Sequence, residues 1–89
     1  MAVKAVSKTI LMVLQRDRRE TAARVQRVLT DFGCVIRTRL GLHDGTGEAC
    51  SQSGLIILEL AGDPGQHRKL SAALGRIKGA KTKRVTIKF

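Results

Sequence analysis

The chain has 89 residues, of which 43% are hydrophobic and 2% aromatic, and it carries a formal net charge of +10. This composition predicts one domain, residues 1–89, with an aliphatic core, and it excludes the base-stacking surface that aromatic residues give to RNA-recognition motifs. The charge favours partners that are anions, and the longest apolar run, residues 10–14, is too short to span a bilayer.

The first half of the chain is predicted to form a strand, a helix and a second strand. Residues 8–15 (KTILMVLQ) are apolar with β-branched members, as is typical of a buried strand. Asp17 and Glu20 match a D-x-x-E capping box, and Gly33 is expected to close the helix with a positive φ. Residues 34–43 alternate in polarity, which predicts a half-exposed strand. The helix between them has apolar residues at helical spacing: Val25, Val28, Leu29 and Phe32.

The second half repeats this order. Residues 55–60 (LIILEL) predict a strand, and Asp63 with Pro64 marks the start of a helix that we expect to end at Gly79. Residues 81–89 alternate in polarity and predict a last strand. The second helix has its own apolar face, formed by Leu70, Ala73, Leu74 and Ile77.

The element order β-α-β-β-α-β predicts an α+β, ferredoxin-like sandwich: a four-stranded antiparallel sheet with two helices on one face. The first and third strands are the most apolar and are expected to be central. Alternation in the second strand places Ile36, Leu40 and Leu42 on its inner side and Arg37, Arg39 and His43 on its outer side. In the last strand, the residues expected to point inward are Val85, Ile87 and Phe89.

The two central strands are apolar on both faces, so one apolar set is expected to lie away from the helices. An exposed apolar sheet face marks an interaction surface. We therefore expect a homo-oligomer, either a dimer or a tetramer. The interface residues predicted from the sequence are Leu11, Val13, Leu55 and Ile57.

The glycine-rich segment 40–54 (LGLHDGTGEACSQSG) separates the second and third strands. A phosphate-binding glycine loop is followed by a helix N-terminus, whereas this segment is followed by a strand. His43 and Cys50 are weak metal candidates, since tight sites have three or four ligands. We expect a hairpin loop, with no metal and no cofactor, although another chain of an oligomer would be able to add ligands.

Three stretches carry a resemblance to a known family: VLQRDR after the first strand, RLGLH in the second strand and AALGRIKGAKTKRVTIKF at the end. They resemble, over residues 9–89, the small ACT-like proteins described as iron-only hydrogenase system regulators. ACT domains carry a D-R-P-G turn where residues 17–20 read D-R-R-E. The chain is also similar to the C-terminal domain of nickel-responsive regulators, without their closely spaced histidines.

This resemblance implies an ACT-like, ligand-sensing regulator of transcription that has no DNA-binding domain of its own and acts as an oligomer. No hydroxyl in the sequence has a convincing general base, so we expect no enzymatic activity. The absence of a secretory signal pattern and of a CxxC pair leads us to expect a cytoplasmic protein. A small anionic ligand is expected at the first strand–helix junction, formed by Asp17, Arg18, Arg19, Glu20 and Thr21.

Two alternatives stay open at this point. A nucleic-acid-binding protein would use a basic surface formed by Arg37, Arg39, Lys81, Lys83 and Arg84. Solvated edge strands explain the same charges, and no helix-turn-helix accompanies them. The second alternative is a metal-responsive regulator.

Overall fold

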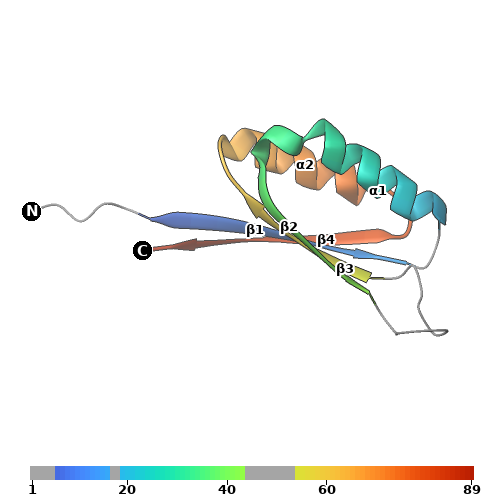
Figure 1. Ribbon diagram of the computed structural model, residues 1–89. Helices are drawn as coiled ribbons and strands as arrows, with labels where there is room; N and C mark the ends of the chain where they lie inside the picture. The colour runs from blue at the N-terminus through green and yellow to red at the C-terminus, as the bar shows by residue number, and fades with distance from the viewer. Residues whose placement is uncertain (1–5, 17–18, 44–53) are drawn as a thin grey trace, which may run out of the picture.

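The computed structural model describes residues 6–16, 19–43 and 54–89. The elements follow in the predicted order: β1 (Ser7–Gln15), α1 (Arg19–Asp31), the short 3-10 helix η1 (Gly33–Val35), β2 (Ile36–His43), β3 (Gly54–Leu60), α2 (Pro64–Gly75) and β4 (Ala80–Lys88) (Figure 1). Within these residues, every helix is too short or too polar to cross a bilayer.

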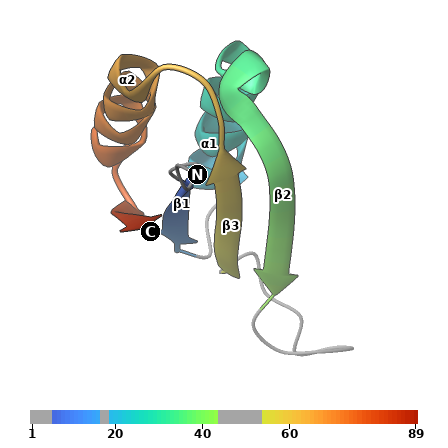
Figure 2. The same ribbon diagram turned by 90° about the vertical axis from the view of Figure 1, so that its left-hand side faces the viewer.

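The four strands form one antiparallel sheet in the order β2-β3-β1-β4, which Figure 2 shows from one end. Both helices lie on the same side of this sheet (Figure 1). The ferredoxin-like fold is confirmed, as is the central position of β1 and β3. We call the sheet face under the helices the covered face and the opposite one the open face.

The hydrophobic core lies between the covered face and the helices. Side chains alternate between the two faces of a strand, so each central strand contributes every second residue. These residues are Leu11, Val13, Ile56, Leu58 and Leu60 from the strands, with Val25, Leu29, Leu70 and Leu74 from the predicted helix faces. Each is at most 7% exposed. Full burial of one such aliphatic side chain contributes about 1.5–3 kcal/mol.

The strand register corrects the predicted open-face residues. Leu11 pairs with Leu58, and Val13 pairs with Ile56. Directly paired residues share a face, so Leu11 and Val13 lie under the helices, fully buried, and their placement on the open face was wrong. Leu55 does lie on the open face. It is joined there by Ile57 and by the other set of β1, namely Ile10, Met12 and Leu14.

The edge strands also differ from the predicted orientation. A register shift between Ile36 and Thr38 changes the phase of β2, so Leu40 pairs with Ile57 on the open face and Arg39 turns toward α1. In β4, Val85 and Ile87 pair with open-face residues of β1, and Phe89 is 99% exposed. Their predicted inward orientation was wrong, because Arg84, Thr86 and Lys88 occupy the helix side of this edge strand.

The helix ends follow the sequence signals in part. Asp63 caps α2 by accepting a hydrogen bond at its Oδ1 from the Gly65 amide, at 3.0 Å. Gly79 has the expected positive φ, +91°, although α2 itself ends at Gly75. Gly33 has no positive φ, since the chain leaves α1 through η1, in which the Val35 amide bonds to the Phe32 carbonyl at 3.1 Å. The Asp17 cap lies outside the described residues.

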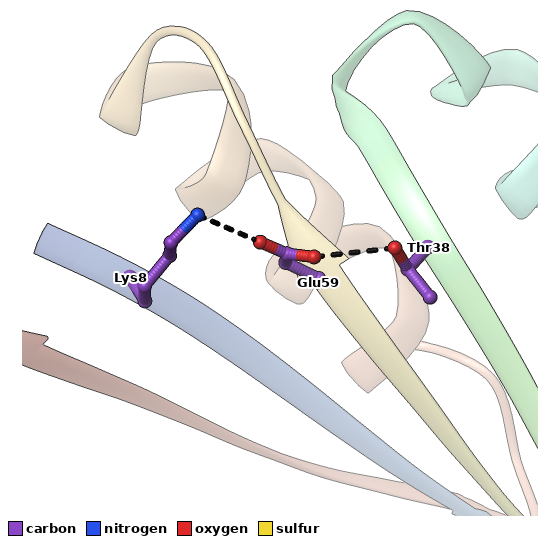
Figure 3. A network of polar contacts seen from close by, with 3 residues as sticks. All are labelled: Lys8, Thr38 and Glu59. Carbon is purple, nitrogen blue, oxygen red and sulfur yellow. Dashed lines mark hydrogen bonds and ion pairs between the residues drawn. The ribbon is translucent and has the colours of Figure 1, made fainter.

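One acidic side chain on the open face is held by two neighbours. Glu59 accepts hydrogen bonds from Lys8 Nζ and from Thr38 Oγ1, each at 3.2 Å (Figure 3). The hydrogen bond from Lys8 and then the one from Thr38 lower the pKa of the Glu59 carboxyl from its ordinary 4.5. The three side chains thus join β1, β3 and β2 across the sheet.

The lowered pKa of Glu59 predicts a pH-dependent contribution to stability. A carboxylate with a depressed folded-state pKa stabilises the fold above its unfolded pKa, and this contribution is lost as the pH falls through the folded value. The Glu59→Gln variant should therefore lose less stability than the unaltered protein between about pH 6 and about pH 3. Urea unfolding at each pH measures this, with Lys8→Met giving a partial effect. Parallel curves for Glu59→Gln and the unaltered protein would contradict the assignment.

The turn before β4 gives a second prediction. A Cβ at Gly79 would lie 2.8 Å from Thr21 Oγ1, and the positive φ disfavours any other residue. Gly79→Ala should therefore cost about 1–3 kcal/mol of unfolding free energy. Gly75→Ala is the matched control: a Cβ there meets nothing within 4 Å, and helix propensity should stabilise it by up to about 1 kcal/mol. Chemical denaturation measures the unfolding free energy of both variants. Equal denaturation midpoints for Gly79→Ala and Gly75→Ala would contradict the predicted strain in the turn.

Candidate functional site

A cleft of about 170 Å³ lies between the end of β1 and the start of α1. Two parts of the chain that are distant in the sequence form it: the residue after β1 with the first turns of α1, and the turn before β4. We call it the junction cleft. Its lining residues are Arg16, Glu20, Thr21, Arg24, Lys78 and Gly79.

Backbone contacts hold the walls of the junction cleft together. The Arg16 amide donates to the Gly79 carbonyl at 2.8 Å, and Thr21 Oγ1 donates to the Lys78 carbonyl at 3.1 Å. Thr21 is only 3% exposed, and the missing side chain of Gly79 lets the turn approach it closely. These bonds fix the start of α1 against the turn before β4. The backbone positions from which the charged side chains of the cleft extend are therefore fixed as well.

The charge of the junction cleft is positive. Among the described residues that line it, three are bases, Arg16, Arg24 and Lys78, and one is an acid, Glu20, which precedes Arg24 by one helical turn. Among the described side chains, no ion pair joins Glu20 to any of these three bases. The helix N-terminus adds a partial positive charge. The arrangement suits a carboxylate or a phosphate, which arginine binds through paired hydrogen bonds.

The sequence located this cleft but named only part of its lining. Glu20 and Thr21 do line it, although the Thr21 hydroxyl is already used within the fold. Arg19 is exposed and does not line the cleft, while Asp17 and Arg18 lie outside the described residues. The residues missed were Arg16, Arg24 and Lys78. Arg24 stands one turn beyond Glu20, so helical spacing was a signal for it, whereas Lys78 is placed only by the tertiary structure.

The basic residues of the nucleic-acid alternative do not form one strip. Lys81 and Lys83 pair with open-face residues of β1, whereas Arg84 pairs with Leu11 and lies on the helix side. Arg39 also lies on the helix side, hydrogen-bonded to Gln26 of α1. Arg37 stands at the register shift of β2 and is exposed. Strand alternation therefore divides the five bases of the nucleic-acid alternative between the two faces of the sheet.

The metal candidates remain predictions. His43 is the last residue of β2, and Cys50 lies outside the described residues. In the part of the chain that the structure describes, no three His, Cys, Asp or Glu side chains gather as metal ligands do.

The open face of the sheet carries exposed apolar side chains from several strands. Each of the other strands adds apolar residues to those of β1. Leu14, Leu40 and Ile87 are 54%, 52% and 63% exposed. Lys81 and Lys83 border this surface along β4. Isolated exposed leucines are ordinary, whereas a face that joins such residues from four strands has the character of surfaces that bind partners.

No protein-family model matches the sequence, and no curated protein matches it either. Among solved structures, an uncharacterized protein from Thermotoga maritima is similar, with a TM-score of 0.73 and 26% identity over 94% of this chain and 99% of that one. The ACT domain of GTP pyrophosphokinase from Chlorobium tepidum has a TM-score of 0.62 and 15% identity, over 92% of this chain and 100% of the domain.

A third similar structure is CPII from Thiomonas intermedia K12, a nitrogen regulatory PII-like protein whose structure was determined with bound ADP, AMP and acetate. Its TM-score is 0.55 at 12% identity, over 98% of this chain and 92% of CPII. These likenesses show the fold, which this chain has in common with ACT domains and PII-like proteins.

Proposed function

We propose that this protein is a small regulator that senses an anionic ligand in the junction cleft and acts as an oligomer. The observation that carries the proposal is the convergence of Arg16, Arg24 and Lys78 on one cleft in which Glu20 is the single acid among the described lining residues. The ACT-like fold supports a regulatory role, and the proposal includes no catalytic step. The resemblance to iron-only hydrogenase system regulators supports control of transcription through a partner protein.

The size of the cleft restricts the ligand. Pockets for drug-sized ligands have volumes of about 300–1,000 Å³, and the junction cleft is smaller, at about 170 Å³. It suits a small carboxylic acid, or the charged end of a larger molecule such as a nucleotide. The bound acetate, AMP and ADP of CPII belong to the same chemical classes.

The position of the cleft offers a route from ligand to assembly. Arg16 directly follows β1, and Lys78 stands two residues before β4. These two strands are paired at this end, where Leu14 lies opposite Lys81 on the open face. A ligand that bridges Arg16 and Lys78 would stabilise the strand ends, and with them the adjacent part of the open face. Ligand binding and oligomer formation are then coupled.

The first test of this proposal is anion binding. Calorimetric titration of the protein with acetate, AMP, ADP and the common amino acids should find at least one ligand. Arg24→Gln should weaken its binding about tenfold or more, because a charge-assisted hydrogen bond is lost. Arg27→Gln is the matched control, since Arg27 is exposed on the same helix outside the cleft. Equal weakening by both variants, or no binding by any of these compounds, would reject the site.

The second test concerns the open face, which we expect a second copy of the chain to cover. Sedimentation velocity at micromolar concentration should show a dimer or tetramer. Ile57→Glu should dissociate it into folded monomers, because Ile57 is on the open face. Leu11→Glu should instead unfold the chain, since Leu11 is fully buried. A stable monomer of the unaltered protein would overturn the proposed assembly.

A further inference from the structure

A second cleft lies at the opposite end of the helix layer from the junction cleft. Figure 1 shows that α1 and α2 begin at opposite ends of the helix layer, and that β1 starts and β4 ends on the side where α2 begins. There, the first turns of α2 and the ends of β1 and β4 enclose about 240 Å³. We call this the terminal cleft. Pro64 and the buried His67 form part of its lining, and the imidazole of His67 is hydrogen-bonded to the Ala61 carbonyl. The other lining residues are Ser7, Thr9 and Thr86, which carry hydroxyls, and Arg68, Arg84 and Lys88, which carry positive charge.

The strand register explains why these side chains gather. Ser7 pairs with Lys88 and Thr9 with Thr86, and all four share the covered face with Leu11. On the covered face of β1, the apolar Val13 and Leu11 are followed toward the start of the strand by Thr9 and Ser7, which bear hydroxyls. The residues of β4 opposite these two are Thr86 and Lys88. The sheet thus presents hydrogen-bond donors where its core ends.

The terminal cleft is positively charged, and none of the described residues that line it carries a carboxylate. Arg84 donates to Ser71 Oγ at 3.3 Å, which is a neutral partner and leaves its charge uncompensated. Within the described residues, no ion pair involves Arg68 or Lys88. Asp63, which directly precedes the lining residue Pro64, caps α2. Three like charges around one cleft repel each other, and a bound anion relieves this repulsion.

The hydroxyl groups add directed donors. Thr9 Oγ1 and Thr86 Oγ1 lie 3.0 Å apart in a hydrogen bond. One of the two must donate to the other, so the accepting hydroxyl keeps its own proton for another acceptor. Hydroxyls and a guanidinium together match the several acceptor oxygens of a phosphate, whereas a single carboxylate would use fewer of them.

From this arrangement we infer that the terminal cleft is a second binding site of the protein, specific for the phosphate group of a small molecule. Arg84 binds two phosphate oxygens, Arg68 and Lys88 neutralise the charge, and the threonine pair supplies a neutral donor. The volume, below that of drug-sized pockets, fits a phosphate with a short substituent. The site uses none of the residues of the junction cleft, so the two proposals stand or fall separately.

The test is a titration of the isotope-labelled protein, followed by amide NMR at constant ionic strength. One arm uses inorganic phosphate and the other glycerol 3-phosphate, which separates free phosphate from a phosphate ester; sodium chloride is the reference. The amide signals of Thr9, Thr86 and Lys88 should shift with a saturable curve. Arg84→Gln should weaken this binding about tenfold or more.

Lys83→Gln is the matched control. It removes the same charge from the neighbouring residue of β4, whose side chain lies on the opposite face of the sheet. It should change the affinity less than twofold. Thermal unfolding checks that both variants are folded, since Lys83 and Arg84 are exposed.

Equal weakening by Arg84→Gln and Lys83→Gln would show that net charge alone attracts phosphate, and would overturn the site. Shifts confined to the junction cleft, or no saturable shifts with either compound, would overturn it as well. A short DNA duplex is a further competitor. Displacement of phosphate from the terminal cleft by the duplex at moderate salt would assign these residues to a nucleic-acid backbone instead, which also contradicts the proposal.

Discussion

The structure depends on two backbone hydrogen bonds that join its halves. The Arg16 amide, after β1, donates to the Gly79 carbonyl at 2.8 Å, and the Ala61 amide, after β3, donates to the Val35 carbonyl at 2.8 Å. Each bond ties the residue that leaves a central strand to the turn that enters an edge strand of the other half. The halves β1-α1-β2 and β3-α2-β4 are therefore interlocked, because neither completes its strand–helix junction alone.

At each of these two strand–helix junctions, a buried polar side chain also forms a hydrogen bond with a backbone carbonyl. Thr21 donates to Lys78 at 3.1 Å, and His67 Nε2 lies 2.7 Å from the Ala61 carbonyl. A carbonyl only accepts, so this nitrogen of His67 carries a proton. An unpaired buried carbonyl would cost about 1–3 kcal/mol. Buried side chains thus set the geometry of the junctions, while exposed charged ones are available for ligands.

The strand register divides the large positive charge into separate groups. In β4, Lys81 and Lys83 border the apolar open face, whereas Arg84 and Lys88 line the terminal cleft on the other side. The bases of the junction cleft, Arg16, Arg24 and Lys78, form a further group, which lies beyond the C-terminal end of α2. A continuous basic surface would follow a nucleic-acid backbone, whereas separated groups with concave surroundings suit small anions. The distribution of the charge therefore carries more functional information than its sum.

The sequence by itself determined the element order, both helix faces and the central position of β1 and β3, because the spacing of apolar residues is a local property of each segment. It did not determine which face of β1 the helices cover, since both faces are almost equally apolar. The one-residue shift near Ile36, which turns Arg39 toward α1, was also invisible, because the shift depends on pairing with β3. The lining of the junction cleft was the least predictable from the sequence. The Lys78 carbonyl accepts a hydrogen bond from Thr21, which is 57 residues away in the chain, and a contact between such distant residues leaves no local sequence pattern.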